Sequence, residues 1–402
     1  MINVAVLGYG TIGSGAVEVI ETNQAVLQKR TRHAVNVKYV LDLREFPGTS
    51  VEKKVIHDFA IIENDSDVQV VIETMGGIEP ACTFARRTLK AGKAYVTSNK
   101  ELVAKHGAEL IALAKANNTN FLFEASVGGG IPIIRPINEC ITGDVILEIS
   151  GILNGTTNYI LSKMTYDGWT FEQALKDAQD KGYAERNPEA DVEGHDPCRK
   201  IAILASLAVG RQVDFEDIYT EGITKVTAED IQYADKLGCK IKLLGTYKMV
   251  DGEHFAMVAP KLVPNIRPLS GVSDAFNSIS VVGNMLGESM FYGAGAGKLP
   301  TASAVIGDVV EAINNLNRNT GIIWNPEKLE LTSTDNFAQK VFIRMKDSVD
   351  REKVAAAFGN VEEVTVDGIH NEYAFVTDVL KEKELKEKTA EFEEILGYIR
   401  LA

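Results

Sequence analysis

Residues 1–21 read MINVAVLGYGTIGSGAVEVIE, and this stretch decides the fold. It predicts a short strand, then the pattern Gly8-x-Gly10-x-x-Gly13, then a helix. Glycines at these positions allow a tight turn, close approach of the backbone to a pyrophosphate and close packing of helix on strand, while the helix N-terminus attracts the phosphate charge. Because a second strand is expected at 35–42, the pattern predicts a dinucleotide-binding domain of the Rossmann type.

The end of this second strand bears on the choice of cofactor. Asp42 stands where a carboxylate would accept the ribose hydroxyl groups of NAD. Arg44 lies where a guanidinium could bind the 2′-phosphate of NADP, although an exposed turn residue before Pro47 would give the same pattern. The two features conflict, so the sequence predicts NAD or NADP without a preference.

Strand and helix patterns continue to alternate through the first third of the chain. A third strand, at 68–73, ends in Thr74-Met-Gly-Gly, and a fourth, at 94–98, is followed by Asn-Lys100. Ligands of open α/β sheets gather at the carboxyl ends of strands, so Lys100 is expected beside the nicotinamide. An exposed lysine in a helix cap is the alternative.

The stretch FLFEASVGGGIPIIRPI, residues 121–137, places Glu124 in an apolar strand that breaks into three glycines. Glycines leave backbone carbonyl groups unshielded, which suits a hard monovalent cation. A strand end with Glu124 paired to a lysine or arginine would have the same sequence.

From residue 146 the pattern changes to that of an α+β domain. A strand at 147–153 leads into the polar turn Asn-Gly-Thr156-Thr-Asn, and strands return at 241–247, 256–262 and 278–282. The glycine-rich run 293–297 then precedes a helix expected at 303–314. Such a turn can hold an anion or a cofactor, although a flexible connector would have the same glycine-rich sequence.

Residues 178–200, AQDKGYAERNPEADVEGHDPCRK, hold ionisable side chains at the edge of a core. Asp196 followed by proline predicts an N-cap with Lys200 in the first helical turn. The helix dipole and partial desolvation would lower the pKa of Lys200 toward a range useful for proton transfer. Asp191 and Asp196 could hold the lysine, and Glu185 could meet a cationic substrate group. A solvated acidic loop is the alternative, but the length of the loop favours function.

The segment 336–402 predicts a ferredoxin-like βαββαβ unit with no chemistry of its own, and therefore an interaction or regulatory module. Its expected elements are strands at 339–345, 361–366, 372–378 and 398–401 and helices at 351–358 and 382–396.

Composition limits the remaining choices. A chain of 402 residues with 45% hydrophobic content suggests two or three domains. Forty-two basic and fifty-six acidic residues give a net charge of −14, which argues against nucleic acid or an anionic membrane as partner. The chain starts with a strand rather than a signal sequence, and no stretch of about 18 apolar residues occurs. We therefore expect a cytoplasmic protein with four free, buried cysteines.

Taken together, these motifs resemble homoserine dehydrogenase. The run 178–200 follows that family's signature, and GYGTIG, TSNK, EASVGGGIPII, NGTTNYI and GAGKLPTASAV also fit, over about residues 1–320. The resemblance implies reversible, NAD(P)-dependent reduction of L-aspartate 4-semialdehyde to L-homoserine, on the route to threonine and methionine. It implies an α/β fold with a Rossmann-type domain at 1–145, completed by about 293–320, and a substrate-binding and dimerisation domain at 146–292.

The resemblance also implies roles for single residues. Lys200 would donate a proton to the aldehyde oxygen, Lys100 would contact cofactor and substrate, and Asp196 would support the site. Glu185 and Asp191 would bind the amino end of the substrate. The other implied residues are Thr156 for the substrate, Gly8, Gly10, Thr11, Ile12, Gly13, Arg44, Thr74 and Gly297 for the cofactor, and Glu124 with the carbonyl groups of Val127, Gly129 and Ile131 for a sodium ion.

The tail, residues 336–402, resembles an ACT domain less closely. Its first loop, residues 345–350, lacks the glycine usual in effector loops of that family, so strong regulation by threonine is not expected. The tail would instead join subunits, as a second contact that turns a dimer into a tetramer.

Two other functions remain as alternatives. One is a dinucleotide-binding, redox-sensing regulator without catalysis, whose acidic charge disfavours DNA binding. The other is another aldehyde-reducing enzyme on the same scaffold. An acylating semialdehyde dehydrogenase is disfavoured because it would need an activated cysteine, and Cys140 and Cys198 have no histidine arranged to activate them, although His195 is close to Cys198 in sequence.

Overall fold

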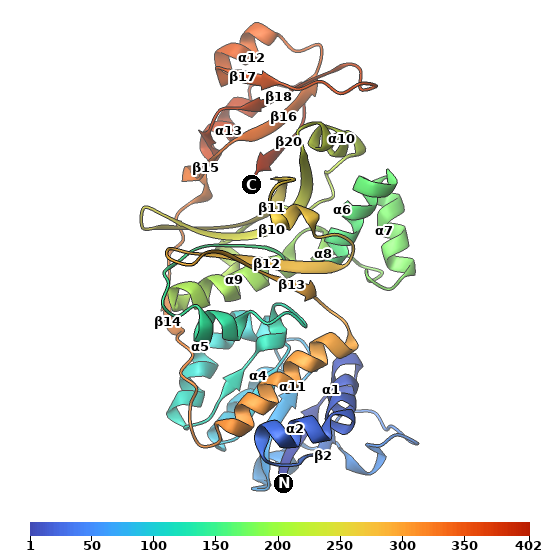
Figure 1. Cartoon of the computed structure of the whole chain (residues 1–402), viewed down its shortest axis with the longest axis vertical. Helices are drawn as coiled ribbons and strands as arrows, with labels where there is room; N and C mark the ends of the chain where they lie inside the picture. Colours follow the sequence, from blue (N-terminus) through green and yellow to red (C-terminus); the bar gives the residue numbers. More distant parts are fainter.

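Two large sheets organise the chain, and the computed structural model describes all of its residues, 1–402 (Figure 1). The first sheet is parallel, in the order β3-β2-β1-β4-β5-β6. Strand order reverses between β1 and β4, which is where open α/β sheets bind ligands. Its strands are β1 (Ile2–Leu7), β2 (Val35–Leu41), β3 (Val55–Ile56), β4 (Val68–Glu73), β5 (Ala94–Thr97) and β6 (Phe121–Leu122).

Alternate residues of these strands pack against helices on opposite faces of the sheet. Val4 and Val6 belong to a buried cluster with α1, α2 and α11, whereas Ala5 and Leu7 belong to a cluster with α3, α4 and α5. Burial on both faces explains why the strands are continuous apolar runs. These helices are α1 (Thr11–Thr22), α2 (Gln24–Thr31), α3 (Phe59–Asn64), α4 (Ala81–Lys90), α5 (Lys100–Ala116) and α11 (Lys298–Asn314).

Helix α11 returns to this first unit from far along the chain. A Cβ on Gly15 of α1 would lie 2.9 Å from the carbonyl oxygen of Lys298, so the two helices pack at a distance that only glycine allows. The helix begins at Lys298 rather than at the predicted Ser303, because the turn that ends at Gly297 leads directly into it.

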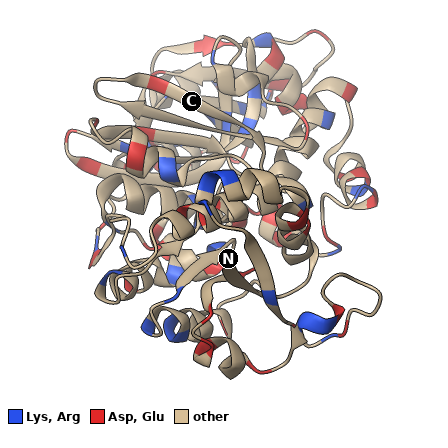
Figure 2. Cartoon of the chain, turned by 60° about the horizontal axis from the view of Figure 1, so that its bottom comes forward, with Lys and Arg blue, Asp and Glu red and all other residues tan.

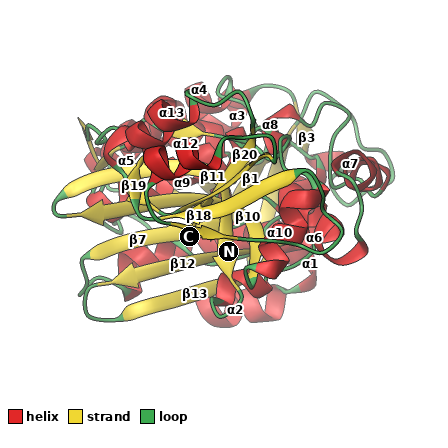
Figure 3. Cartoon of the chain, turned by 90° about the horizontal axis from the view of Figure 1, so that it is seen from above, coloured by secondary structure: helices red, strands yellow, loops and turns green.

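The second sheet is mixed, and its order is β13-β12-β7-β10-β11-β20-β16-β18-β17, with β9 also paired to β11. Figure 3 shows β13, β12, β7 and β10 following one another across it. Helix α9 packs on β7, β10 and β11. The elements up to α10 are β7 (Ile146–Ile152), α6 (Gly155–Asp167), α7 (Phe171–Asp180), α8 (Glu189–Val192), α9 (His195–Val209), β9 (Tyr219–Thr220) and α10 (Ala228–Lys236), followed by β10 (Cys239–Val250), β11 (Glu253–Pro264), β12 (Phe276–Gly283) and β13 (Gly287–Ala294).

The tail has the predicted βαββαβ succession and continues the second sheet. Its strand β20 pairs with β16 and, in parallel, with β11 of the preceding unit. The second helix ends at Thr389, not at the predicted 396, because the next residues turn and then pair with β16. The tail elements are β16 (Val341–Lys346), α12 (Arg351–Phe358), β17 (Val361–Glu363), β18 (Glu372–Thr377), α13 (Glu382–Thr389) and β20 (Ile395–Leu401).

Two short ladders complete the architecture. They pair β14 (Asn325–Lys328) with β8 (Arg211–Gln212), and β15 (Ala338–Gln339) with β19 (Leu380–Lys381). The first ties the segment before the tail to the second unit, and the second lies within the tail.

Charge distribution, helix length and the cysteines are three features of the structure that relate to the composition. Acidic and basic residues are interspersed along the chain (Figure 2). No helix is long and apolar enough to cross a membrane. All four cysteines are free, as predicted, but Cys140 is exposed rather than buried because it ends the turn Pro136–Cys140 at the surface.

Candidate active site

The glycine-rich turn after β1 forms a cradle at the N-terminus of α1. A Cβ on Gly13 would lie only 1.9 Å from the carbonyl oxygen of Gly8, so this close approach requires glycine. At Gly10, by contrast, a Cβ would meet nothing within 4 Å, and no side chain caps α1 there. The first N–H groups of the helix, from Thr11 and Ile12 onward, thus face open space that can hold an anion.

Thr74, at the end of β4, fixes this cradle. Its hydroxyl group lies 3.0 Å from the carbonyl oxygen of Gly8 and 3.2 Å from that of Leu7. Thr74 therefore joins the ends of β1 and β4, on the two sides of the point where strand order reverses.

Asp42 and Arg44 form a pair beside the glycine turn. Arg44 donates two hydrogen bonds of 3.0 Å to the carboxylate of Asp42, which also accepts one of 2.8 Å from the backbone N–H of Tyr9. The hydrogen bonds from Arg44 hold the pKa of Asp42 well below its usual range, despite partial burial. The carboxylate and the guanidinium that suggested opposite cofactors thus neutralise each other.

A second cluster of charges lies where α5 and α9 approach each other. The Nζ of Lys200 donates to Asp196 Oδ2 at 2.8 Å and to the carbonyl oxygen of Leu153 at 2.7 Å. The Nζ of Lys100 lies 2.7 Å from the other oxygen of Asp196. One buried carboxylate therefore holds two lysines, and Lys100 directly follows β5 at the cofactor edge of the first sheet.

Two family models match this chain, and together they cover most of it. The NAD-binding domain of homoserine dehydrogenase matches residues 8–124, and the homoserine dehydrogenase model matches residues 132–310. The homoserine dehydrogenase of Bacillus subtilis is 41% identical over 358 residues, which are 87% of this chain and 82% of the relative. That of Synechocystis is 43% identical over 320 residues, 78% of this chain and 73% of the relative. The chain belongs to the homoserine dehydrogenase family.

Solved structures agree with this assignment. A homoserine dehydrogenase from Thiobacillus denitrificans superposes with a TM-score of 0.91 at 32% identity, over 100% of this chain and 98% of that chain. A hyperthermophilic archaeal homoserine dehydrogenase in complex with NADPH gives a TM-score of 0.66 at 25% identity, over 77% of this chain and 97% of that chain. Members of the family are NAD(P)-dependent oxidoreductases that act on homoserine, and nothing in the comparisons supports a non-catalytic regulator.

In this homoserine dehydrogenase the start of α9 differs from the sequence prediction. Gly194, with a φ of 84°, is the N-cap, Asp196 lies inside the first turn, and Lys200 follows in the second. The pKa of Lys200 is nevertheless lowered, as predicted, although the cause is burial together with the charge of Lys100, which outweigh Asp196. The helix dipole is not needed to explain why the pKa of Lys200 is lowered.

The two neighbours of Lys200 shift the opposite way. Burial alone would lower the pKa of Lys100, but the charge of Asp196 and a hydrogen bond to it raise the pKa above its usual value. Burial alone would raise the pKa of Asp196, but the charges of Lys200 and Lys100 hold it well below its usual range. Lys100 therefore holds its proton more firmly than an ordinary lysine, Asp196 stays ionised, and Lys200 is the lysine of the two that releases its proton more easily.

The remaining residues expected at the substrate lie around this cluster. Asp191 is joined to Asp196 through Asn154, whose Nδ2 donates to both carboxylates, at 2.8 and 2.9 Å. Thr156 is buried, and its hydroxyl group donates to the carbonyl oxygen of Tyr183 at 2.7 Å. Glu185 is exposed in the same loop, and its carboxylate accepts no hydrogen bond. The structure thus gathers Asp191 into the cluster but leaves Glu185 outside it.

The expected cation site has a different donor set from the one its sequence suggests. The Glu124 carboxylate accepts hydrogen bonds from the backbone N–H groups of Ile133, Ile134 and Arg135, at 2.6, 2.7 and 2.9 Å, and from Arg135 Nε at 3.2 Å. Glu124 is thus paired with an arginine, as in the alternative interpretation of its sequence. The carbonyl groups of Val127, Gly129 and Ile131 are buried and accept no hydrogen bond. No group of three His, Cys, Asp or Glu side chains could hold a metal ion.

The second glycine-rich run packs against this carbonyl-lined turn. A Cβ on Gly129 would lie 2.2 Å from the carbonyl oxygen of Gly295, and the N–H of Gly130 donates to Ala294 at 3.0 Å. Gly297 has a φ of 120° and begins α11. The run is therefore a fixed joint between the two units rather than a flexible connector.

Two polar residues in the site were not singled out from the sequence. One is Asn154, which could have been recognised as the N-cap that opens NGTTN. The other is Glu73, a buried carboxylate that accepts hydrogen bonds from Met75 N at 2.6 Å, Gly76 N at 3.2 Å and Thr97 Oγ1 at 2.7 Å. An acidic residue ending an apolar strand is its signal, and it shapes the loop where β4 leads toward the cofactor edge.

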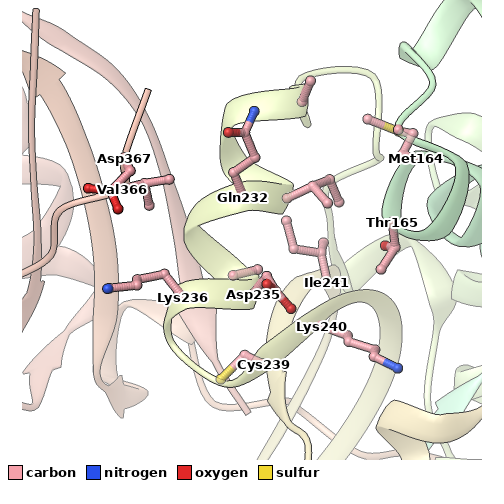
Figure 4. Close-up of a pocket in the computed structure, with 14 residues that line it drawn as sticks. Met164, Thr165, Gln232, Asp235, Lys236, Cys239, Lys240, Ile241, Val366 and Asp367 are labelled. Carbon is pink, nitrogen blue, oxygen red and sulfur yellow. The ribbon is translucent and has the colours of Figure 1, made fainter. Parts of the chain in front are cut away.

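A cavity of about 490 Å³ lies elsewhere, between the end of α6, helix α10 and the tail loop that carries Asp367 (Figure 4). In the figure Met164 and Thr165 face it from one side and Val366 from the other. It contains none of the residues expected to bind cofactor or substrate.

Proposed function

We propose that Lys100, Asp196 and Lys200 carry out the homoserine dehydrogenase reaction, the interconversion of L-aspartate 4-semialdehyde and L-homoserine. The observation that carries this proposal is one buried carboxylate that holds two lysines beside the carboxyl end of β5. An aldehyde becomes an alcohol when its carbon accepts a hydride and its oxygen a proton. When bound, the nicotinamide cofactor supplies or accepts the hydride.

Lys200 is the proton donor in this proposal. An ammonium group has three N–H donors, and two of those on Lys200 are taken by Asp196 and the Leu153 carbonyl group. The third is left for the aldehyde oxygen, and the lowered pKa favours transfer of that proton. In the oxidative direction the neutral amine takes the proton back from the hydroxyl group.

The other residues position the substrate. Lys100 keeps its charge, so it can hold the oxygen and balance the negative charge that develops there. Asp191 faces the cluster and can accept the substrate ammonium group. Glu185 is free to close on the same ammonium group from the loop, and Thr156 holds that loop in place through Tyr183.

The cradle of Gly8, Gly10, Thr11, Ile12 and Gly13 would hold the pyrophosphate, with Thr74 and Gly297 shaping its sides. The pairing of Asp42 with Arg44 supports the use of both cofactors. With NADP, Arg44 can turn toward the 2′-phosphate, and with NAD, Asp42 can accept the ribose hydroxyl groups. Lys100 would contact the nicotinamide end.

We also propose a sodium site at the turn after Glu124. Three buried carbonyl groups without hydrogen-bond donors are ligands of the kind that a hard cation prefers. The carboxylate of Glu124 has no free lone pair, so its own ligand would be the backbone carbonyl group of Glu124.

The wider assignments are proposals of the same kind. We place the cofactor domain at 1–145 with 293–320, the substrate and dimerisation domain at 146–292, and an ACT-like domain at 336–402. The enzyme would act as a dimer through its substrate domain, or as a tetramer through its tail, on the route to threonine and methionine. Four unpaired cysteines support a reducing, cytoplasmic location.

Loss of NADPH absorbance on addition of L-aspartate 4-semialdehyde tests the function. We expect turnover that needs both compounds and runs backward with L-homoserine and NADP. A protein that binds NADPH but consumes it with neither substrate would contradict the proposal.

A further inference from the structure

We propose that Asn154 is a positioning residue, whose single amide group holds Asp191 and Asp196 side by side so that each meets its own cation. Asp196 would hold Lys100 and Lys200, and Asp191 would stay open to the substrate ammonium group. This inference rests on the roles proposed above for those carboxylates.

Asn154 is fixed from both ends. It is the N-cap of α6, and its Oδ1 accepts hydrogen bonds from Thr157 N at 2.9 Å and Thr157 Oγ1 at 3.1 Å. Its Nδ2 then has one orientation, and its two hydrogens point to Asp191 Oδ1 and Asp196 Oδ2. The residue is 6% exposed, so water cannot replace these bonds easily.

Only an amide has the donor and acceptor pattern that these contacts need. A serine can cap the helix but has one hydrogen to donate, and an aspartate can cap it but has none. Two carboxylates held near each other repel, and without a shared donor the repulsion would be relieved by moving apart or by taking up a proton. The two hydrogen bonds from Asn154 oppose both the separation of the carboxylates and their protonation.

The charged groups that face the pair come from three helices. Helix α5 contributes Lys100 with Glu101 beside it, and α9 contributes Lys200 and Asp196, while α8 contributes Asp191. Burial and Asp196 raise the pKa of Asp191, and the hydrogen bond from Asn154 opposes this. Losing that bond should therefore make Asp191 take up a proton at a higher pH.

Two substitutions separate the donor function from the cap. Asn154→Ser keeps a capping oxygen and loses the bridge, whereas Asn154→Asp keeps the cap and adds a third negative charge. For Asn154→Ser we expect kcat/KM for L-aspartate 4-semialdehyde, the direction that needs protonated Lys200, to fall about 10- to 100-fold, which corresponds to a charged hydrogen bond, mainly through KM. Its acid limb should move to higher pH while its alkaline limb stays.

Asn154→Asp should move both limbs upward, because an added negative charge raises the pKa of carboxylates and of Lys200 alike. Cofactor affinity should not change in either variant. Asp58→Ala is the matched control, since it removes the exposed N-cap of α3, a helix of the first unit. It should lower Tm and leave the pH profile in place.

If both Asn154 variants lose stability but keep the wild-type pH profile and KM, the residue is only a helix cap and the inference is wrong. If the wild-type enzyme has no activity with homoserine, the proposed function fails instead. Carbon-13 titration of labelled aspartates then still decides the inference, since Asn154→Ser must raise the midpoint of Asp191, and an unchanged midpoint would overturn it.

Discussion

A lysine can act as an acid near neutral pH only where its surroundings weaken its hold on the proton. Lys200 is 9% exposed, and Lys100 stands across the same carboxylate, so burial and repulsion both favour the neutral amine. The charge of Asp196 opposes these two effects and favours the protonated form of Lys200. The arrangement thus shifts the pKa values of two identical side chains in opposite directions, down for Lys200 and up for Lys100.

Removing the Lys200 amine should therefore affect chemistry more than binding. Lys200→Ala should lower kcat by about 10²- to 10⁴-fold, the usual contribution of a positioned acid, with little change in the Kd for NADPH. Asp196 keeps Lys100 as its partner, so the fold should survive. Lys105→Ala, which removes an exposed lysine of α5, is the control. Wild-type turnover in the Lys200 variant would show that another group donates the proton.

The pH dependence should have opposite signs in the two directions. The reduction needs the protonated amine, so its kcat is full below the pKa of Lys200 and is lost as the pH rises through it. The oxidation needs the neutral amine and should gain rate over the same range. Because the pKa is lowered, the shared midpoint should lie below 10.5, the ordinary value for lysine. Profiles of kcat against pH in both directions measure this, and midpoints at or above the ordinary value would exclude Lys200.

Cofactor choice depends on whether Arg44 leaves Asp42 to meet a phosphate. Arg44→Ala should weaken NADPH binding by about 1–3 kcal/mol, the range for a charged hydrogen bond, and leave NADH nearly unchanged. Lys53→Ala removes another exposed cation of the same loop and should change neither. Fluorescence titration with both cofactors gives the constants. Equal losses of affinity for NADPH and NADH would show that Arg44 does not bind the 2′-phosphate.

At the scale of elements, local patterns located β1, β2, β4 and β5 of the first sheet and erred where tertiary contacts decide. Asp196 followed by proline has the form of a cap, yet α9 starts at Gly194, whose left-handed backbone fits beneath Thr220 and Val258. That contact is invisible in the local sequence. The sequence also did not predict strand β13. Its outward residues, such as Met290 and Tyr292, are apolar, so the sequence lacks the alternation of polar and apolar residues that marks an edge strand.

In the glycine turn after β1, Gly10 and Gly13 are required for different reasons. Gly13 is needed by the fold, since a Cβ there would overlap the Gly8 carbonyl group, whereas Gly10 has open space and an ordinary negative φ of −82°. Gly13→Ala should lower Tm by several degrees, and Gly10→Ala should leave Tm unchanged but weaken NADPH at least tenfold, about 1.4 kcal/mol, by blocking the pyrophosphate. Thermal unfolding with and without NADPH distinguishes them. Equal Tm losses in both variants would remove the distinction.

At the scale of the whole molecule, the sequence indicated three units but not how the tail is attached. Two buried arginines make the attachment: Arg344 pairs with Asp230, and Arg400 with Glu221 and with Glu382 of the tail. These partners are more than a hundred residues apart, except for Glu382, and no local pattern links them. The tail therefore docks on its own chain, through β11 and β20, whether or not it also joins subunits.

A short segment connects this docking to the candidate active site. Glu221, which holds Arg400, is followed by Gly222, and a Cβ on Gly222 would lie 2.1 Å from the carbonyl oxygen of Val192. The N–H of Ile223 also donates to that oxygen, at 2.8 Å. Val192 is the last residue of α8 and leads into the turn between Asp191 and Asp196, so the tail supports the spacing of the two carboxylates.

A chain that ends at Ser333 should therefore keep cofactor binding but bind homoserine less well, which revises the expectation that all the chemistry is independent of the tail. Loss of Arg400 and Arg344 leaves Glu221 and Asp230 without partners, and unpaired charges at a newly exposed face favour local opening. We expect a lower Tm and a raised KM for L-homoserine, with the Kd for NADPH nearly unchanged. The cut lies beyond Trp324 and Leu329, which stay buried against the rest of the chain. Its mass in solution, beside that of the intact protein, reports whether the tail also joins subunits. An unchanged KM would show that the substrate-binding unit holds the Val192 turn without the tail.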